Sequence, residues 1–383
     1  MVFLFCLGAS VGSFLNVVVY RVPAGLSIVR PGSHCFSCQA PIRWYDNIPI
    51  LAWFYLRGRC RNCGAKFSIR YALVELFTAI LFVMVYKGYF YLGLREPMPA
   101  FTHWGWLIYA GHMALICVLL TATLIDAEHW IIPLSVSYTA AIIGLGLSAV
   151  WPYCLGEHTQ NYWRIIPYAG PKMAAAALGG GLGLLSGLIL LKLGLIKRSF
   201  AEVEALEKEC EQKGVEMPEM KVPIRREMLR EAMFLTPSVV LGVLFIKILT
   251  GENSVGQWWN SVIIQQKWCA GLLGSLFGFM IGGGVVWATR ILGSVAFGKE
   301  AMGLGDVHLM AAVGSVLGWV SPTVAFFVAP FFGLGWALLS LVIHRRREIP
   351  YGPWLSLATV AVMILFEPIM DYLEVFFIPP VIP

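Results

Sequence analysis

The chain has 383 residues, of which 58% are hydrophobic and only 13% charged, and its mean hydropathy is +0.74. Soluble domains carry about 25% charged residues, so these values exclude an ordinary soluble globular protein. The formal net charge of +6 comes from basic residues that cluster in a few loops. This pattern is a topology signal and not the continuous basic face of a nucleic-acid-binding protein. We therefore expect the lipid bilayer, and no nucleic acid, as a partner.

Ten apolar stretches are long enough to cross a bilayer as helices. The first, at 1–20, has no positively charged start, so we interpret it as a span and not as a cleaved signal peptide. The others lie at about 71–94, 104–125, 131–151, 173–195, 233–250, 270–292, 307–321, 323–343 and 353–373. The sequence therefore predicts an all-α polytopic membrane protein with about ten transmembrane helices.

Lys and Arg residues gather in every second loop between these stretches. Eight lie in 21–70, eight in 196–232 and three in 344–352. Cytoplasmic loops are enriched in these residues, so the pattern predicts that all three basic loops are cytoplasmic. The alternation depends on a count of ten spans. With this topology, Asp126 and Asp306 both lie at cytoplasmic ends of predicted spans.

The first basic loop contains two CxxC pairs, formed by Cys35 with Cys38 and by Cys60 with Cys63. Two such turns about twenty residues apart are typical of a tetrahedral Cys₄ zinc site, because each turn presents two thiolates to one metal ion. A cytoplasmic loop is reducing, which disfavours disulfides. We predict a structural zinc ion without an open coordination position. Redox-active dithiols and unligated cysteines are the alternatives.

Two aspartates lie where predicted spans begin or end. Asp126 lies between two spans, and Asp306 follows Gly303 and Gly305 at the start of another. An ionisable residue at membrane depth is a functional candidate by default. Two facing carboxylates share a proton, so one can activate water while the other protonates a peptide carbonyl. This pair predicts an intramembrane aspartyl peptidase in which the two glycines leave room for a substrate backbone. The alternative is that each aspartate is the N-cap of the helix that follows it.

Four other polar residues lie within the spans or near the aspartates. Glu75 lies inside the second span, where a carboxylate needs a partner, and helix packing and a functional role are both open. Glu128 and His129 are interpreted as interfacial polar residues, with an auxiliary site role as the alternative. His308 can make the local charge depend on pH near neutrality.

Several further motifs are distinctive. They are Gly12-Ser-Phe-Leu-Asn16, Tyr20-Arg-Val-Pro23, Arg30-Pro-Gly-Ser-His-Cys35, Asp46-Asn-Ile-Pro49, Leu56-Arg-Gly-Arg-Cys60, Arg70-Tyr-Ala-Leu-Val-Glu75-Leu and Pro350-Tyr-Gly-Pro353. Together they resemble the prepilin peptidase (type IV leader peptidase) family, whose members are related to the presenilin-like membrane aspartyl proteases. The resemblance covers residues 8–150 and 270–365. Asp126 and Asp306 fall on the family's two catalytic aspartates.

This resemblance implies a peptidase of the bacterial inner membrane. It implies cleavage, on the cytoplasmic side, after the short basic leader of type IV prepilins or type II secretion pseudopilins. It also implies N-methylation of the new N-terminal residue from S-adenosylmethionine, although the sequence contains no glycine-rich nucleotide-binding signature. The alternatives are a peptidase without methyltransferase activity, and a transporter or assembly factor with a structural zinc domain.

Three features depart from the family pattern. Leu134 stands where the family usually has Asp, His308 stands where it usually has Lys, and the stretch 151–269 has no counterpart. The predicted organisation is a first helix at 1–20, a cytoplasmic zinc-binding domain associated with methyl transfer at 21–70, a membrane domain with Asp126 at 71–150, an insertion with two helices and a charged loop at 151–269, and a membrane domain with Asp306 at 270–383.

Overall fold

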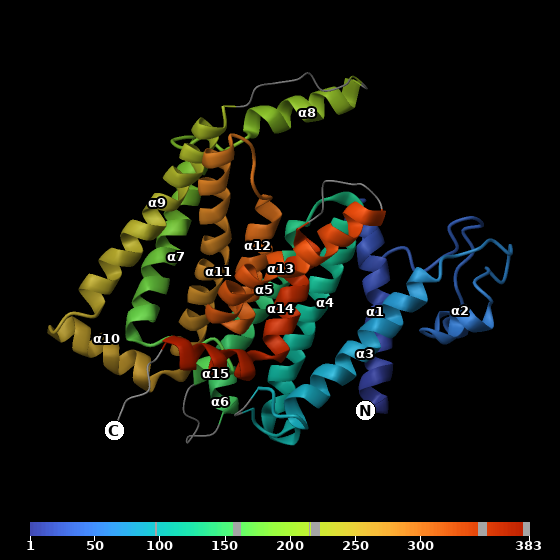
Figure 1. Cartoon of the computed structure of the whole chain (residues 1–383), viewed down its shortest axis with the longest axis horizontal. Coiled ribbons are helices and arrows are strands. Elements are labelled where there is room, and N and C mark those ends of the chain that lie inside the picture. The colour runs from blue at the N-terminus through green and yellow to red at the C-terminus, as the bar shows by residue number, and fades with distance from the viewer. Residues whose placement is uncertain (96–97, 156–161, 214, 216–222, 344–350, 378–383) are drawn as a thin grey trace. The chain divides into compact units, whose positions relative to one another are not determined.

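The computed structural model consists mainly of helices, with a long, largely irregular segment at 22–69 that contains only short helices at Trp44–Asn47 and Leu51–Tyr55 (Figure 1). It describes residues 1–95, 98–155, 162–213, 215, 223–343 and 351–377. Within these residues the extended pairing consists of two isolated bridges, His34 with Pro41 and Arg59 with Lys66. The predicted all-α fold class is therefore confirmed. The basic residues of 344–350, together with Pro350, lie outside the described part of the chain.

The chain divides into two compact units. Unit 1 comprises Met1–Ile143, Cys154–Ile165 and Ala325–Pro383, and unit 2 comprises Gly144–Tyr153 and Ile166–Val324.

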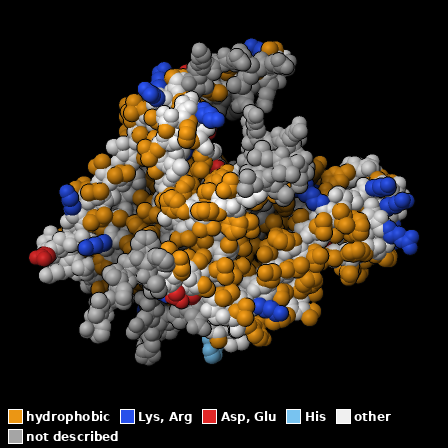
Figure 2. Space-filling view, viewed as in Figure 1, with side chains coloured by type: hydrophobic (Ala, Val, Ile, Leu, Met, Phe, Trp, Pro, Cys, Tyr) orange, Lys and Arg blue, Asp and Glu red, His pale blue; other side chains and the backbone are white. Residues whose placement is uncertain are grey.

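Six helical segments among the described residues are long and apolar enough to cross a membrane. They are α1 (Val2–Arg21), α3 (Arg70–Phe90), α4 (Trp106–His129, extended N-terminally to Phe101), α7 (Pro171–Lys192), α9 (Ile224–Leu249) and α11 (Lys267–Phe297). A seventh candidate is the pair α14 (Gly352–Ile364) and α15 (Phe366–Phe377), which is bent by 82°. Figure 2 shows hydrophobic side chains over much of the visible surface of the helices.

The predicted count of ten spans is not confirmed. The remaining apolar helices are α5 (Leu134–Ser148), α12 (Leu304–Leu317) and α13 (Val320–Ile343). The fully described part of each is 10–17 residues long. At 1.5 Å per residue, the 14 residues of α12 extend only about 21 Å, which is less than the ~30 Å of a bilayer core. Each predicted apolar stretch nevertheless coincides with one of these helices or, at 353–373, with the bent pair α14 and α15.

In unit 1, α1 and α3 pack closely through glycines. A Cβ atom at Gly8 would lie 2.8 Å from Ala79 Cα, and one at Gly12 would lie 2.8 Å from Glu75 Cα. Only a residue without a side chain permits this approach, as in other membrane helix pairs. The two helices flank the segment that contains the four cysteines and the short helix α2 (Leu51–Tyr55).

In unit 2, α12 packs along α11. Gly278 and Gly314 face each other so closely that a Cβ on either would collide with the other's backbone carbonyl. This contact holds α12, the helix that carries Asp306, against a much longer helix. The other helices of this unit and its borders are α6 (Trp151–Cys154), α8 (Ala201–Lys213) and α10 (Ser254–Gln265).

Candidate functional site

The four predicted metal ligands, Cys35, Cys38, Cys60 and Cys63, form one cluster. Their Sγ atoms lie within 4.8 Å of one another, with 3.8 Å between Cys35 and Cys63 and 4.0 Å between Cys38 and Cys60. Zinc bound to four sulfurs at ~2.3 Å in a tetrahedron places the sulfurs about 3.8 Å apart. The donor set therefore fits one zinc ion.

The two cysteine turns are built alike. The bridge between His34 and Pro41 closes the first turn, and the bridge between Arg59 and Lys66 closes the second. The residue after the second cysteine of each turn has a positive φ angle, 57° at Gln39 and 71° at Gly64. This left-handed residue reverses the chain tightly, so each pair of thiols is presented from a compact loop.

Hydrogen bonds favour the thiolate form of two of the four cysteines, Cys38 and Cys60, whereas burial and the neighbouring thiols raise the pKa of Cys63 to about 11. The backbone of Ala40 and the side-chain amide of Asn62 donate to Cys38 and lower its pKa to about 6. Backbone N–H groups of Cys63 and Asn62 likewise lower the pKa of Cys60. Because the thiolate is the metal-binding form, these donors favour metal binding.

An ion pair connects the second cysteine turn to the segment between the turns. Arg61 donates from Nε and from a terminal nitrogen to the two carboxylate oxygens of Asp46, at 2.8 and 2.6 Å, and its terminal nitrogen also donates to the Tyr55 hydroxyl at 2.8 Å. These bonds lower the pKa of Asp46. The motif that begins at Asp46 therefore crosslinks the cysteine domain.

Asp126 lies in the last turn of α4 and is 7% exposed. Its carboxylate lies against the backbone of Gly352 at the start of α14, and the Gly352 N–H donates a hydrogen bond to it. A Cβ at Gly352 would lie only 2.6 Å from Asp126 Oδ2. The N-cap alternative is wrong for Asp126, because α4 continues to His129 and α5 begins only at Leu134.

Gly352 had no role in the sequence-based prediction. The available signal was the Gly-Pro pair of the late motif, because proline is favoured in the first turn of a helix and Pro353 therefore indicates a helix start at this point. The Cβ of any larger residue would also lie 3.1 Å from Ile132 Cδ1. Nothing in either local pattern indicates that Gly352 meets Asp126.

Asp306 is the third residue of α12 and is 8% exposed. Gly303 is the N-cap, with extended backbone at φ −70° and ψ 147°, so the N-cap alternative is wrong for Asp306 too. Gly305 is the second helical residue, and His308 is half-buried two residues after Asp306. A Cβ at Gly303 would lie 3.6 Å from Asp306 Oδ2, which is an ordinary contact. The fold itself therefore does not require glycine at position 303.

A buried ion cluster holds the loop that leads to Gly303. Arg290 of α11 lies 3.1 Å from the Glu231 carboxylate and 2.5 Å from Glu300, and it also donates to the Met302 carbonyl. Arg290 and Glu231 are only 2% and 4% exposed. The sequence analysis missed this cluster, although an arginine within the apolar run of α11 was a signal for it. Glu231 lies within the predicted insertion, so this segment supports the loop before Asp306.

Glu75 is buried in α3 and has two partners. Its Oε2 accepts the Ile50 N–H at 2.6 Å, and the Ser13 side chain also donates to it. Ile50 has φ 64°, which is rare for a β-branched residue, within a tight turn closed by a 2.6 Å bond from Leu51 N–H to the Pro49 carbonyl. The sequence left helix packing and a functional role open for Glu75, and these contacts support the packing role.

The structure brings some predicted residues together. The four cysteines form one cluster, and Gly303 adjoins Asp306. Asp126 belongs to unit 1 and Asp306 to unit 2, so their pairing stays a prediction.

Comparison with known proteins identifies the family of the chain. A family model described as the bacterial peptidase A24 N-terminal domain matches residues 6–89, and one described as the type IV leader peptidase family matches residues 231–338. The prepilin leader peptidase/N-methyltransferase of Klebsiella pneumoniae is 35% identical over 190 residues, which cover 48% of this chain and 71% of that protein. The chain belongs to the type IV leader peptidase family. The second match begins inside the segment predicted as an insertion.

Two other family members have the same name as the Klebsiella relative. The protein of Myxococcus xanthus is 44% identical over 190 residues, which cover 47% of this chain and 52% of that relative. The protein of Aeromonas hydrophila is 25% identical over 386 residues, which cover 94% of this chain and 87% of that relative. The chain thus spans about half the length of the Myxococcus relative. No solved structure matches the chain. Family membership and the apolar helices together make this a multi-pass membrane protein.

Proposed function

We propose that the chain is an aspartyl endopeptidase of the bacterial inner membrane. Its substrates are type IV prepilins or type II secretion pseudopilins, whose leader peptide it removes on the cytoplasmic side. The observation that carries the proposal is the burial of Asp126 and Asp306, each near a helix end, in a leader peptidase family member. The names of the relatives, which specify prepilin leaders, support the substrate class.

In the proposed reaction the two aspartates act as a pair. The ionised carboxylate removes a proton from water, which attacks the scissile carbonyl carbon, while the protonated carboxyl donates to the carbonyl oxygen. The peptide C–N bond then breaks and the departing amine takes up a proton. Because the two groups titrate together, neither role belongs to a particular residue. The N–H of Gly352 orients the Asp126 carboxylate for this task.

We propose further that the chain methylates the new N-terminal amine from S-adenosylmethionine. The methyltransferase names of the relatives and the cysteine cluster support this second activity. When bound, S-adenosylmethionine supplies an electrophilic methyl group. The zinc ion that fits the cysteine cluster has a structural role, because the four thiolates complete its tetrahedral coordination.

Leader cleavage by purified protein in detergent tests the peptidase. Asp126→Asn and Asp306→Asn are each expected to slow cleavage of a prepilin by at least ~10²-fold, because each removes a group that transfers protons. Asp371→Asn is the matched control, since Asp371 is an exposed carboxylate of α15. Wild-type cleavage by either of the first two variants would refute the pair.

Mass spectrometry of the processed substrate separates the bifunctional enzyme from a peptidase alone. With S-adenosylmethionine present, the new N-terminus is expected to gain one methyl group. A product that is shortened but never methylated favours the alternative without methyltransferase activity.

Metal analysis tests the cysteine cluster. We expect about one zinc per chain, and Cys38→Ser to release it, because three thiolates leave the tetrahedral site incomplete. Cys6→Ser, at an exposed cysteine of α1, is the control and should keep its zinc. Equal zinc content in both variants would contradict the ligand set.

A further inference from the structure

A cavity of about 430 Å³ lies in unit 1, where the cytoplasmic ends predicted for α1, α3 and α4 meet. Asn16 and Tyr20 line it from the opening motifs, Arg70 and Tyr71 line it from the motif that begins α3, and Glu128 lines it from the end of α4. The volume lies within the ~300–1,000 Å³ range of small-molecule sites. Motifs that are separate in the sequence, and that the peptidase reaction leaves unused, thus share one cavity.

The lining groups combine opposite charges with aromatic rings. Arg70 and Glu128 form an ion pair, and their side chains are 43% and 39% exposed, so both remain within reach of a ligand. Tyr20 and Tyr71 contribute aromatic rings. The Asn16 side-chain nitrogen donates to the Tyr71 carbonyl at 3.0 Å, which fixes the amide beside the cavity. A small molecule with a zwitterionic end, a cationic centre and a flat base matches this set of groups.

We propose that this cavity binds S-adenosylmethionine for the methylation step, an inference that rests on the proposed function. Arg70 suits the carboxylate of the methionine moiety because a guanidinium pairs with carboxylates through two hydrogen bonds. Glu128 suits the ammonium group beside that carboxylate. The tyrosine rings stack with adenine and attract the sulfonium through their negative faces.

The proposed methyl transfer needs only the cleaved substrate and the methyl donor as reactants. The amine nitrogen of the cleaved substrate bonds to the methyl carbon, and the electron pair of the broken carbon–sulfur bond stays on sulfur. The product sulfide is neutral, and the proton of the methylated amine passes to water. Glu128, which lines the cavity, follows Asp126 by two residues in the last turn of α4.

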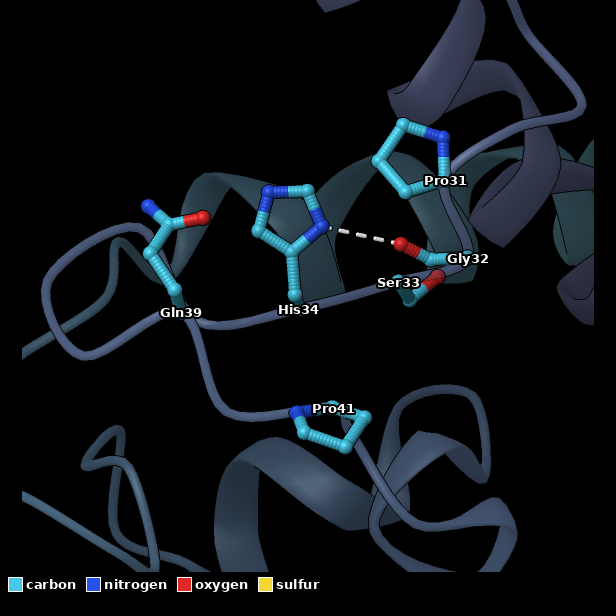
Figure 3. A pocket seen from close by; sticks show the side chains of 6 residues that line it. All are labelled: Pro31, Gly32, Ser33, His34, Gln39 and Pro41. Atoms are coloured by element: carbon cyan, nitrogen blue, oxygen red, sulfur yellow. Dashed lines mark hydrogen bonds between the residues drawn. The ribbon is translucent and has the colours of Figure 1, made fainter.

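A second cavity, beside the first cysteine turn, fits this ligand less well. It measures about 250 Å³ and is lined by Pro31, Gly32, Ser33, His34, Gln39 and Pro41 (Figure 3). Its imidazole donates from Nδ1 to the Gly32 carbonyl at 2.9 Å. None of these six residues is an arginine, a carboxylate or a tyrosine, so the cavity lacks the groups for a zwitterion and an adenine.

Direct binding of the methyl donor tests the inference without the substrate. Purified full-length protein in lipid nanodiscs is dialysed against radiolabelled S-adenosylmethionine, and bound label is counted. Tyr20→Ala and Arg70→Gln are each expected to weaken binding about tenfold, whereas Tyr20→Phe keeps the ring and should bind like the wild type. Tyr91→Ala is the matched control, because Tyr91 is an exposed tyrosine at the other end of α3.

Each outcome has a distinct meaning when bound zinc and thermal stability show that the variants are folded. Wild-type donor affinity in both Tyr20→Ala and Arg70→Gln overturns the cavity assignment, even if the wild type methylates prepilin. Unchanged donor affinity with a raised KM for prepilin also overturns it, since the cavity then holds substrate. A wild type that cleaves prepilin but neither binds the donor nor methylates refutes the methyltransferase activity and the inference together, and leaves the peptidase intact.

Discussion

The carboxylate of Asp126 lies against the backbone of Gly352, whereas Asp306 follows a loop that Arg290 and Glu231 anchor from a distance. The first arrangement is a single tight contact in which even one added carbon collides with the carboxylate. The second spreads its support over several buried hydrogen bonds and leaves ordinary space beside the carboxylate. Two aspartates with one proposed task therefore differ in what holds them. Substitution of the groups that hold each aspartate should therefore affect mainly stability in the ion cluster before Asp306 and mainly activity at Gly352 beside Asp126.

The largest effect is expected on stability, in the ion cluster that anchors the loop before Asp306. Arg290→Met leaves the Glu231 carboxylate buried without its cation, which should lower the free energy of unfolding by ~3–5 kcal/mol. Denaturant or thermal unfolding of the purified protein measures this loss. The exposed Arg225 of α9 offers the control Arg225→Met, which should change stability little.

A double variant identifies the cause. Arg290→Met combined with Glu231→Leu removes both charges, so it should recover part of the stability lost in the single variant. If Arg290→Met unfolds like the wild type, the cluster does not anchor the loop before Asp306, and the contrast between the two aspartates disappears.

Near Asp126 the expected effect is on catalysis. Gly352→Ala places a methyl group 2.6 Å from the present position of Asp126 Oδ2, so the carboxylate must move. A displacement of about 1 Å can reduce turnover ~10²-fold. Leader cleavage at saturating substrate, with the unfolding temperature of the same preparation, measures both consequences.

Gly335→Ala is the matched control for that variant, because Gly335 has open space around its missing Cβ. We expect it to cleave at the wild-type rate. Normal cleavage by Gly352→Ala would mean that the contact with Gly352 does not orient Asp126.

Local patterns predicted the features that depend on neighbours in sequence. Two CxxC turns determine where their own thiols point, and the 3.8 Å and 4.0 Å sulfur separations follow from bringing the two turns together. Helix positions were also predictable, because apolar composition marks them. Helix length was less predictable. The apolar run of the sequence continues through Gly318, but the backbone of Gly318, with a φ of 80°, ends α12. Hydropathy therefore overestimated that helix as a full span.

Contacts between distant segments were not predictable from one sequence. Neither Gly352 nor Asp126 carries a local sign of its partner, and Glu231 lies in a stretch in which the sequence alone showed no family motif, although the leader peptidase family model matches the chain from residue 231. Such pairs are determined by how helices pack, which no short pattern records. Both pairs involve residues that hold the aspartates, so the unpredicted part of the site is its support.

The smallest effect on leader cleavage is expected at Gly303, the glycine beside Asp306. The added Cβ of Gly303→Ala would make only a 3.6 Å contact with Asp306 Oδ2, and the residue has an ordinary negative φ. Alanine in place of an N-cap glycine is expected to cost about 1 kcal/mol of stability at most. If glycine serves an approaching substrate backbone, kcat/KM for leader cleavage should still fall about tenfold, with more loss in Gly303→Val. Equal kcat/KM in the glycine, alanine and valine proteins would show that the space beside Asp306 is not used by substrate. Reduced kcat/KM in variants that stay folded would show that Gly303 leaves room for the chain to be cut, a role different from the positioning role proposed for Gly352.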